Sequence, residues 1–130
     1  MTRVAANETG DKAVYQGRSL ADWASEVSGL IADRFDVTRI VLFGSVARGD
    51  DGPDSDIDLL VVMPIVGRRH EATVSVMTAL RDIPAPVSIV VVDSTRFDEE
   101  ALTPGIVRVA MREGKTLWQS TTMREQEPDS

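Results

Sequence analysis

A glycine and a serine at positions 44 and 45 directly follow an apolar run that is typical of a buried strand. Glycine carries no Cβ, so backbone N–H groups beside Gly44 can approach a ligand closely. If residues 45–48 begin a helical turn, their free N–H groups point at one spot, which suits phosphate. Ser45 adds a hydroxyl donor, and Arg48 adds a positive charge one turn further along. This turn is therefore a candidate binding site for a phosphorylated ligand.

Two aspartates, Asp56 and Asp58, open the next apolar run. Alternate residues of a strand face the same side, which places the two Cα atoms roughly 6.5–7 Å apart with both carboxylates pointing one way. Such a pair suits Mg²⁺, which prefers oxygen ligands and leaves some positions for substrate phosphate. Combined with a phosphate-binding turn, the pair predicts a magnesium-bound nucleoside triphosphate and phosphoryl transfer chemistry.

The hydrophobic pattern predicts alternating helices and strands around these residues. The expected elements are a helix of about 16 residues after Ser19, strand 39–43, a polar loop to Ser55, strand 57–63, helix 70–82, strand 87–92, a short helix after Ser94, a helix from Thr103-Pro104 to Gly114, and an edge strand at 115–119. This order favours an α/β or α+β layer fold with a small mixed sheet.

Finer expectations concern two segments. In helix 70–82 we expect four apolar side chains to face inward, namely Val74, Met77, Ala79 and Leu80. In the polar loop we expect three acidic residues to be solvated rather than to bind a ligand, namely Asp50, Asp51 and Asp54.

Composition favours one domain of modest size. The chain has 130 residues, of which 42% are hydrophobic. We expect a flexible arm at 1–17, a domain at 18–118 and a disordered tail at 119–130. The formal net charge of −7 disfavours non-specific nucleic-acid binding. The absence of cysteine excludes thiolate metal sites, and no apolar run has transmembrane length, so a cytoplasmic protein without a membrane partner is expected.

The central motifs resemble those of the minimal nucleotidyltransferases, the MNT branch of the DNA polymerase beta superfamily. The matching runs are Phe43-Gly44-Ser45-x-Ala47-Arg48-Gly49 and Asp54-Ser55-Asp56-Ile57-Asp58-Leu59, and the resemblance extends over about residues 18–118. It implies a polymerase beta-like fold and transfer of a nucleoside monophosphate from a nucleoside triphosphate, with release of pyrophosphate. By the same resemblance Gly44 and Ser45 would hold the triphosphate, and Asp56 and Asp58 would bind Mg²⁺.

One position departs from the family pattern. Members of the family place a third acidic residue on the next strand, where it ligates metal and helps to deprotonate the attacking hydroxyl. The matching residue here is Ser88, which brings no negative charge and is no comparable base. Asp93 lies five residues later, so on a regular strand it faces the opposite side. A bulge would be needed for Asp93 to substitute.

Three functions follow as hypotheses. The first is transfer of AMP from ATP to a partner protein, because stand-alone members of this family are often antitoxins paired with HEPN-type ribonuclease toxins. The second is a catalytically weakened or inactive antitoxin that binds its partner without transfer, as Ser88 suggests. The third is modification of a small molecule such as an antibiotic, with a homo-oligomer closing the substrate pocket.

Overall fold

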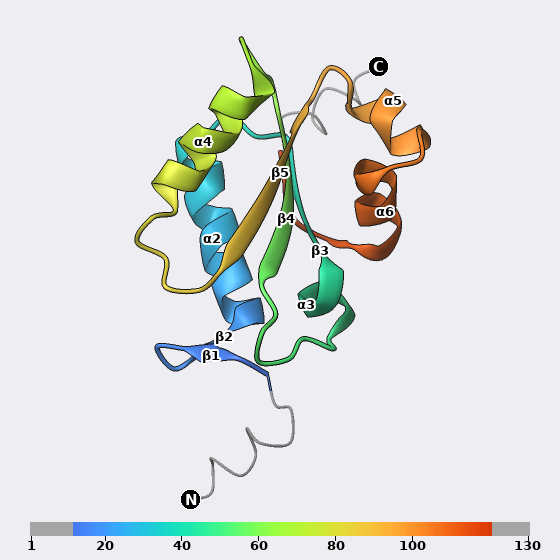
Figure 1. Ribbon diagram of the computed structural model, residues 1–130. Coiled ribbons are helices and arrows are strands. Elements are labelled where there is room, and N and C mark those ends of the chain that lie inside the picture. Colours follow the sequence, from blue (N-terminus) through green and yellow to red (C-terminus); the bar gives the residue numbers. More distant parts are fainter. Residues whose placement is uncertain (1–11, 121–130) are drawn as a thin grey trace, which may run out of the picture.

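A computed structural model describes residues 12–120 and shows one four-stranded sheet between two layers of helices (Figure 1). The expected small mixed sheet with packed helices is thereby confirmed. In chain order the elements are β1 (Val14–Tyr15), β2 (Arg18–Ser19), α2 (Leu20–Arg34), β3 (Arg39–Phe43), α3 (Gly44–Arg48), β4 (Ile57–Met63), α4 (Arg69–Ala79), β5 (Val87–Asp93), α5 (Phe97–Leu102), α6 (Ile106–Glu113) and β6 (Lys115–Gln119).

The strand order of the sheet is β5-β4-β3-β6, with β4 parallel to β5 and the other two pairs antiparallel. The long connection from β3 to β4 returns the chain to the same end of the sheet. Register therefore pairs the last residue of β3, Phe43, with Asp58 near the start of β4. On the other side of β4, Asp58 pairs with Ser88 of β5.

The sheet buries both faces, one beneath α2 and α4 and the other beneath α5 and α6 (Figure 1). Because side chains alternate along a strand, Leu59 of β4 packs toward α2 while Leu60 packs toward α6. Asp58 has the parity of Leu60, so it belongs to the face covered by α5 and α6. The expected helix after Ser19 is confirmed, and the Ser19 hydroxyl accepts a hydrogen bond from the Asp22 N–H (3.1 Å).

Helix α4 differs from the sequence-based expectation in length and in its buried face. It ends at Ala79 rather than 82, and Val74 and Met77 are 48% and 39% exposed. The buried residues are Val76 and Leu80, one helical turn apart. The expected inward set was therefore right for Leu80 and wrong for Val74 and Met77. The helix covers the sheet edge with a narrow stripe, so apolar residues beside that stripe stay in solvent.

Helix α6 begins at Ile106, two residues after the expected Thr103-Pro104 start. Thr103 instead closes α5, since its N–H donates to the Glu100 carbonyl and its hydroxyl donates to the Glu99 carbonyl (2.9 Å). Gly105, with φ of 156°, then lies directly before α6. A threonine–proline pair can follow one helix as readily as it begins the next. Here Thr103 forms its hydrogen bonds with the preceding helix, α5.

The expected N-terminal arm contains a hairpin within its described part. β1 and β2 pair across Gln16 and Gly17, which both have positive φ (50° and 77°), as in the tight turns that join two-residue hairpins. The Trp23 indole donates to the Tyr15 carbonyl (2.8 Å), which anchors the hairpin on α2. Most of the predicted arm, 1–11, and most of the predicted tail, 121–130, lie outside the described residues.

Candidate active site

The turn after β3 forms a five-residue helix, α3, that starts at Gly44. Gly44 has φ of 81°, a left-handed conformation that favours glycine. A Cβ at this position would overlap the Oδ2 atom of Asp58. The backbone angle therefore favours glycine, and a larger residue would have to displace the Asp58 carboxylate. The helical turn expected at 45–48 is present, and it begins directly beside the Asp58 carboxylate.

Asp56 and Asp58 converge at the start of β4, and both are partly exposed. Burial and the charge of Asp56 raise the pKa of Asp58 above its ordinary value, while the Arg48 guanidinium opposes this shift. Asp56 and Arg48, both named from the sequence, thus lie close enough to Asp58 to affect its pKa. Arg48 itself lies at the exposed rim, where it pairs with Asp50 (3.4 Å).

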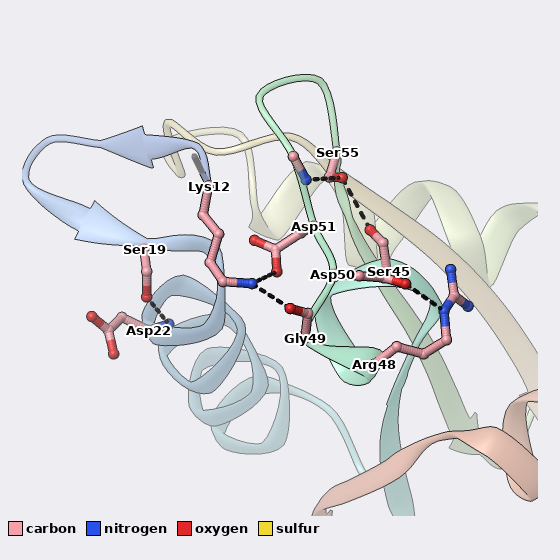
Figure 2. A network of polar contacts seen from close by, with 10 residues as sticks. Lys12, Ser19, Asp22, Ser45, Arg48, Gly49, Asp50, Asp51 and Ser55 are labelled. Atoms are coloured by element: carbon pink, nitrogen blue, oxygen red, sulfur yellow. Dashed lines mark hydrogen bonds and ion pairs between the residues drawn. The ribbon is translucent and has the colours of Figure 1, made fainter. Parts of the chain in front are cut away.

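Ser45 is held by a residue that sequence reasoning did not single out. Its hydroxyl donates to the Ser55 hydroxyl (3.1 Å), which in turn accepts a hydrogen bond from the Gly52 N–H (2.9 Å), as Figure 2 shows. Ser55 therefore fixes both the Ser45 side chain and the loop that returns to β4. The available signal was its position next to Asp56 within the same motif.

Asp51 corrects the expectation that all three loop acids are solvated. Asp50 and Asp54 are exposed as expected, but the Asp51 side chain is only 5% exposed. Its Oδ1 atom pairs with the Lys12 ammonium (2.8 Å), which also donates to the Gly49 carbonyl (Figure 2). A buried carboxylate needs such a partner, because its desolvation would otherwise be uncompensated. Local sequence could not reveal a cation 39 residues away.

The structure separates the two candidates for a third polar ligand. Ser88 is exposed and lies directly beside Asp58 in the β4–β5 register. Asp93 lies at the other end of β5, opposite Met63, and its parity is that of the face toward α2. Its carboxylate accepts bonds from the Thr95 N–H and hydroxyl (3.1 and 3.0 Å), which lower the pKa of Asp93. Asp93 therefore caps the following turn and cannot substitute at the Asp58 end.

The charges at this end of the sheet fit a divalent cation. Two carboxylates lie together, and a cation between them would offset the repulsion that raises the Asp58 pKa. Within residues 12–120, no group of three or more His, Cys, Asp or Glu side chains is placed to hold a metal ion. A cation here would thus take two protein carboxylates and the remaining oxygens from substrate and water.

Known proteins are similar in sequence to the segment that contains these residues. The sequence profile of a family described as "Nucleotidyltransferase domain" matches residues 24–116. Over 44 residues the chain is 36% identical to the "Putative protein adenylyltransferase MJ0141" of Methanocaldococcus jannaschii, a stretch that is 34% of this chain and 42% of that protein. The matched segment thus spans less than half of the relative's length.

Solved structures share the fold. A "putative nucleotidyltransferase" from Sulfolobus solfataricus superposes with a TM-score of 0.57 and 25% identity, over 78% of this chain and 82% of that one. A mutant of the toxin–antitoxin MntA-HpeT superposes with a TM-score of 0.53 and 20% identity, over 78% and 76% of the two chains.

In residues 12–120, none of the helices combines the length and the apolar composition needed to cross a membrane.

Proposed function

Since this chain belongs to the nucleotidyltransferase domain family, we propose that it transfers a nucleoside monophosphate, AMP from ATP, to a hydroxyl group of a partner protein. The observation that carries the proposal is the contact between Gly44 and the Asp58 carboxylate. This contact supports the proposal because phosphoryl transfer requires a group that binds phosphate and a carboxylate that binds metal, and Gly44 and Asp58 are suited to these two roles.

Each named residue has a role in the proposal. Asp56 and Asp58 hold Mg²⁺, which neutralises charge on the triphosphate. The backbone of Gly44 binds phosphate oxygens, and the Ser45 hydroxyl does so by turning its proton from Ser55 to the phosphate. Arg48 is exposed and supplies positive charge near the phosphates, in a protein whose net charge is −7.

The proposed reaction is a displacement at the α-phosphorus of ATP. The acceptor oxygen forms a bond to the α-phosphorus, and the bond from that phosphorus to the bridging oxygen breaks, releasing pyrophosphate. The hydroxyl proton leaves to water, because Ser88 occupies the position from which a carboxylate would accept it. A missing base commonly costs on the order of 10²–10⁴ in rate, so transfer is expected to be slow.

The proposed acceptor is a HEPN-type toxin. The motifs resemble those of stand-alone antitoxins of the family, and a structure of the same fold belongs to a toxin–antitoxin pair.

Ser88 favours a second candidate, an antitoxin that binds its partner without transfer. Exposed serine beside Asp58 offers neither a third metal charge nor a base. On this alternative the sheet and its helices remain as a binding scaffold, and changes at Asp56 and Asp58 leave neutralisation of the toxin intact.

The test uses ATP labelled at the α-phosphate, Mg²⁺ and the product of the neighbouring gene. Wild-type protein should label that product, Asp58→Asn should not, and Asp93→Asn should label it normally. Absence of label on any protein, with wild type and Asp58→Asn alike, would end the transfer proposal. Toxin neutralisation by a folded Asp56→Ala/Asp58→Ala double variant would then support binding alone, and its loss would contradict that alternative.

A further inference from the structure

We propose that Lys12 is a positioning residue for nucleotide binding, because it clamps the loop that supports the Gly44–Arg48 helix. The effect on nucleotide binding rests on the proposed function, whereas the contacts of Lys12 with the loop do not. Lys12 and the hairpin that follows it precede the family-matched segment 24–116, whereas Gly49 and Asp51 lie within it.

The clamp consists of two contacts from one ammonium group. Lys12 Nζ donates to the Gly49 carbonyl (2.6 Å) and to Oδ1 of Asp51 (2.8 Å). The two acceptors lie two residues apart in the loop, so the lysine spans the bend between them, as Figure 2 shows. Lys12 is half exposed, whereas the Asp51 side chain is almost fully buried.

The burial of Asp51 makes the loop conformation depend on Lys12. An ionised carboxylate in this position is stable only with a charged or hydrogen-bonded partner. Without the lysine, the Asp51 carboxylate would be more stable if it were hydrated. The loop would have to open to bring it into water. The position of the loop is thus coupled to a residue 39 positions away in the chain.

Gly49 transmits this restraint to the phosphate-binding turn. It ends α3 in a left-handed conformation (φ 82°), and its N–H donates to the Val46 carbonyl (3.2 Å). The Asp50 N–H donates to the Ser45 carbonyl (3.1 Å). A helix of five residues has few hydrogen bonds of its own, so fixing Gly49, which follows its last residue, also restrains Ser45.

The hairpin offers a rigid base for the lysine. The Trp23 indole donates to Tyr15, and the Arg18 guanidinium stacks over the Trp23 ring at 4.2 Å. These contacts tie the hairpin to α2, a helix whose apolar face is buried in the core. The clamp therefore links the phosphate-binding turn to the main core of the domain.

The experiment compares the wild-type protein with Lys12→Met, Lys12→Arg and Arg81→Met. Lys12→Met removes the charge and keeps the length, and Lys12→Arg restores a donor. Arg81→Met removes an exposed cation that follows α4 and belongs neither to the hairpin nor to the loop. Hydrogen exchange of the 44–55 region is measured without nucleotide, and affinity for Mg²⁺–ATP is measured by calorimetry.

We expect Lys12→Met to speed exchange of 44–55 by at least about tenfold while the core strands exchange as in wild type. We expect it to weaken the affinity for Mg²⁺–ATP by about tenfold or more. Most of both effects should be reversed in Lys12→Arg, and both should be absent in Arg81→Met. Unchanged exchange in Lys12→Met would overturn the clamp. Faster exchange with unchanged affinity would overturn the positioning role. A wild type that binds no Mg²⁺–ATP would refute the proposed function and the positioning role, leaving the clamp to the exchange measurement.

Discussion

The carboxylate of Asp58 occupies the space in which any residue other than glycine at position 44 would place its Cβ. The two residues are 14 positions apart in the chain but meet because β3 and β4 are antiparallel and pair Phe43 with Asp58. The glycine turn and the carboxylate proposed to bind metal thus lie in one candidate site, and a larger residue at position 44 would have to displace the Asp58 side chain.

Gly44→Ala should abolish nucleotide binding and destabilise the fold. Alanine at φ 81° is strained by about 1–3 kcal/mol, and its methyl group would displace Asp58. Gly67→Ala is a matched control outside the site, because Gly67 also has positive φ (93°) and an added Cβ would meet only the Glu71 side chain at 3.4 Å.

Calorimetry with Mg²⁺–ATP and chemical denaturation of both variants separate the two effects. Backbone strain should lower the stability of both variants, whereas the loss of affinity should be at least about tenfold greater for Gly44→Ala. Equal affinities would contradict the predicted role of the Gly44–Asp58 contact.

Asp58→Asn should remove transfer but stabilise the metal-free protein at neutral pH. Burial, with the charge of Asp56, raises the folded-state pKa of Asp58 above its ordinary value of 3.8. The folded chain therefore binds more protons than the unfolded chain between those two pKa values, so the free energy of unfolding falls as pH rises through that window. The asparagine variant lacks this loss.

Thermal unfolding in a chelating buffer measures whether the Asp58→Asn variant is more or less stable than the wild type at each pH. Above the window the variant should unfold at the higher temperature, and below pH 3.8 this advantage should vanish. Adding Mg²⁺ with ATP should then stabilise the wild type alone. A variant that is less stable than wild type at neutral pH would show that ionised Asp58 carries no electrostatic cost.

Ser88→Asp should increase the transfer rate by on the order of 10²–10⁴ if the chain is a slow enzyme. The new carboxylate would lie beside Asp58 in the β4–β5 register and could both bind metal and accept the hydroxyl proton. Ser88→Asn is the uncharged control. Single-turnover labelling of the acceptor measures the rate, and equal rates for the two variants would exclude a missing base as the limiting factor.

Asp93→Asn should leave affinity for Mg²⁺–ATP within about twofold of wild type. Asp93 lies at the opposite end of β5 from Ser88, and its carboxylate caps the turn at Thr95. A tenfold loss of affinity would require Asp93 to reach the site, contrary to its place in the sheet. The variant therefore also serves as a charge-matched control for Asp58→Asn.

Local patterns were sufficient for the main elements that build the site. Strand 39–43 was predicted with its observed bounds because apolar residues fill it and glycine follows it. The parity of Asp93 also followed from the strand period alone. Helix α4 was harder, because its stripe is narrow and Val74 and Met77 lie beside it rather than in it.

The sequence by itself determined which residues stand at the strand ends, because hydrophobic period and turn residues are local properties of the chain. It therefore named Gly44, Ser45, Asp56 and Asp58 before any contact was known. Only the tertiary structure decided that Asp58 contacts Gly44, that Ser55 holds Ser45, and that Lys12 neutralises a buried Asp51. These contacts depend on strand register and on charges brought together over long separations, which no local pattern encodes.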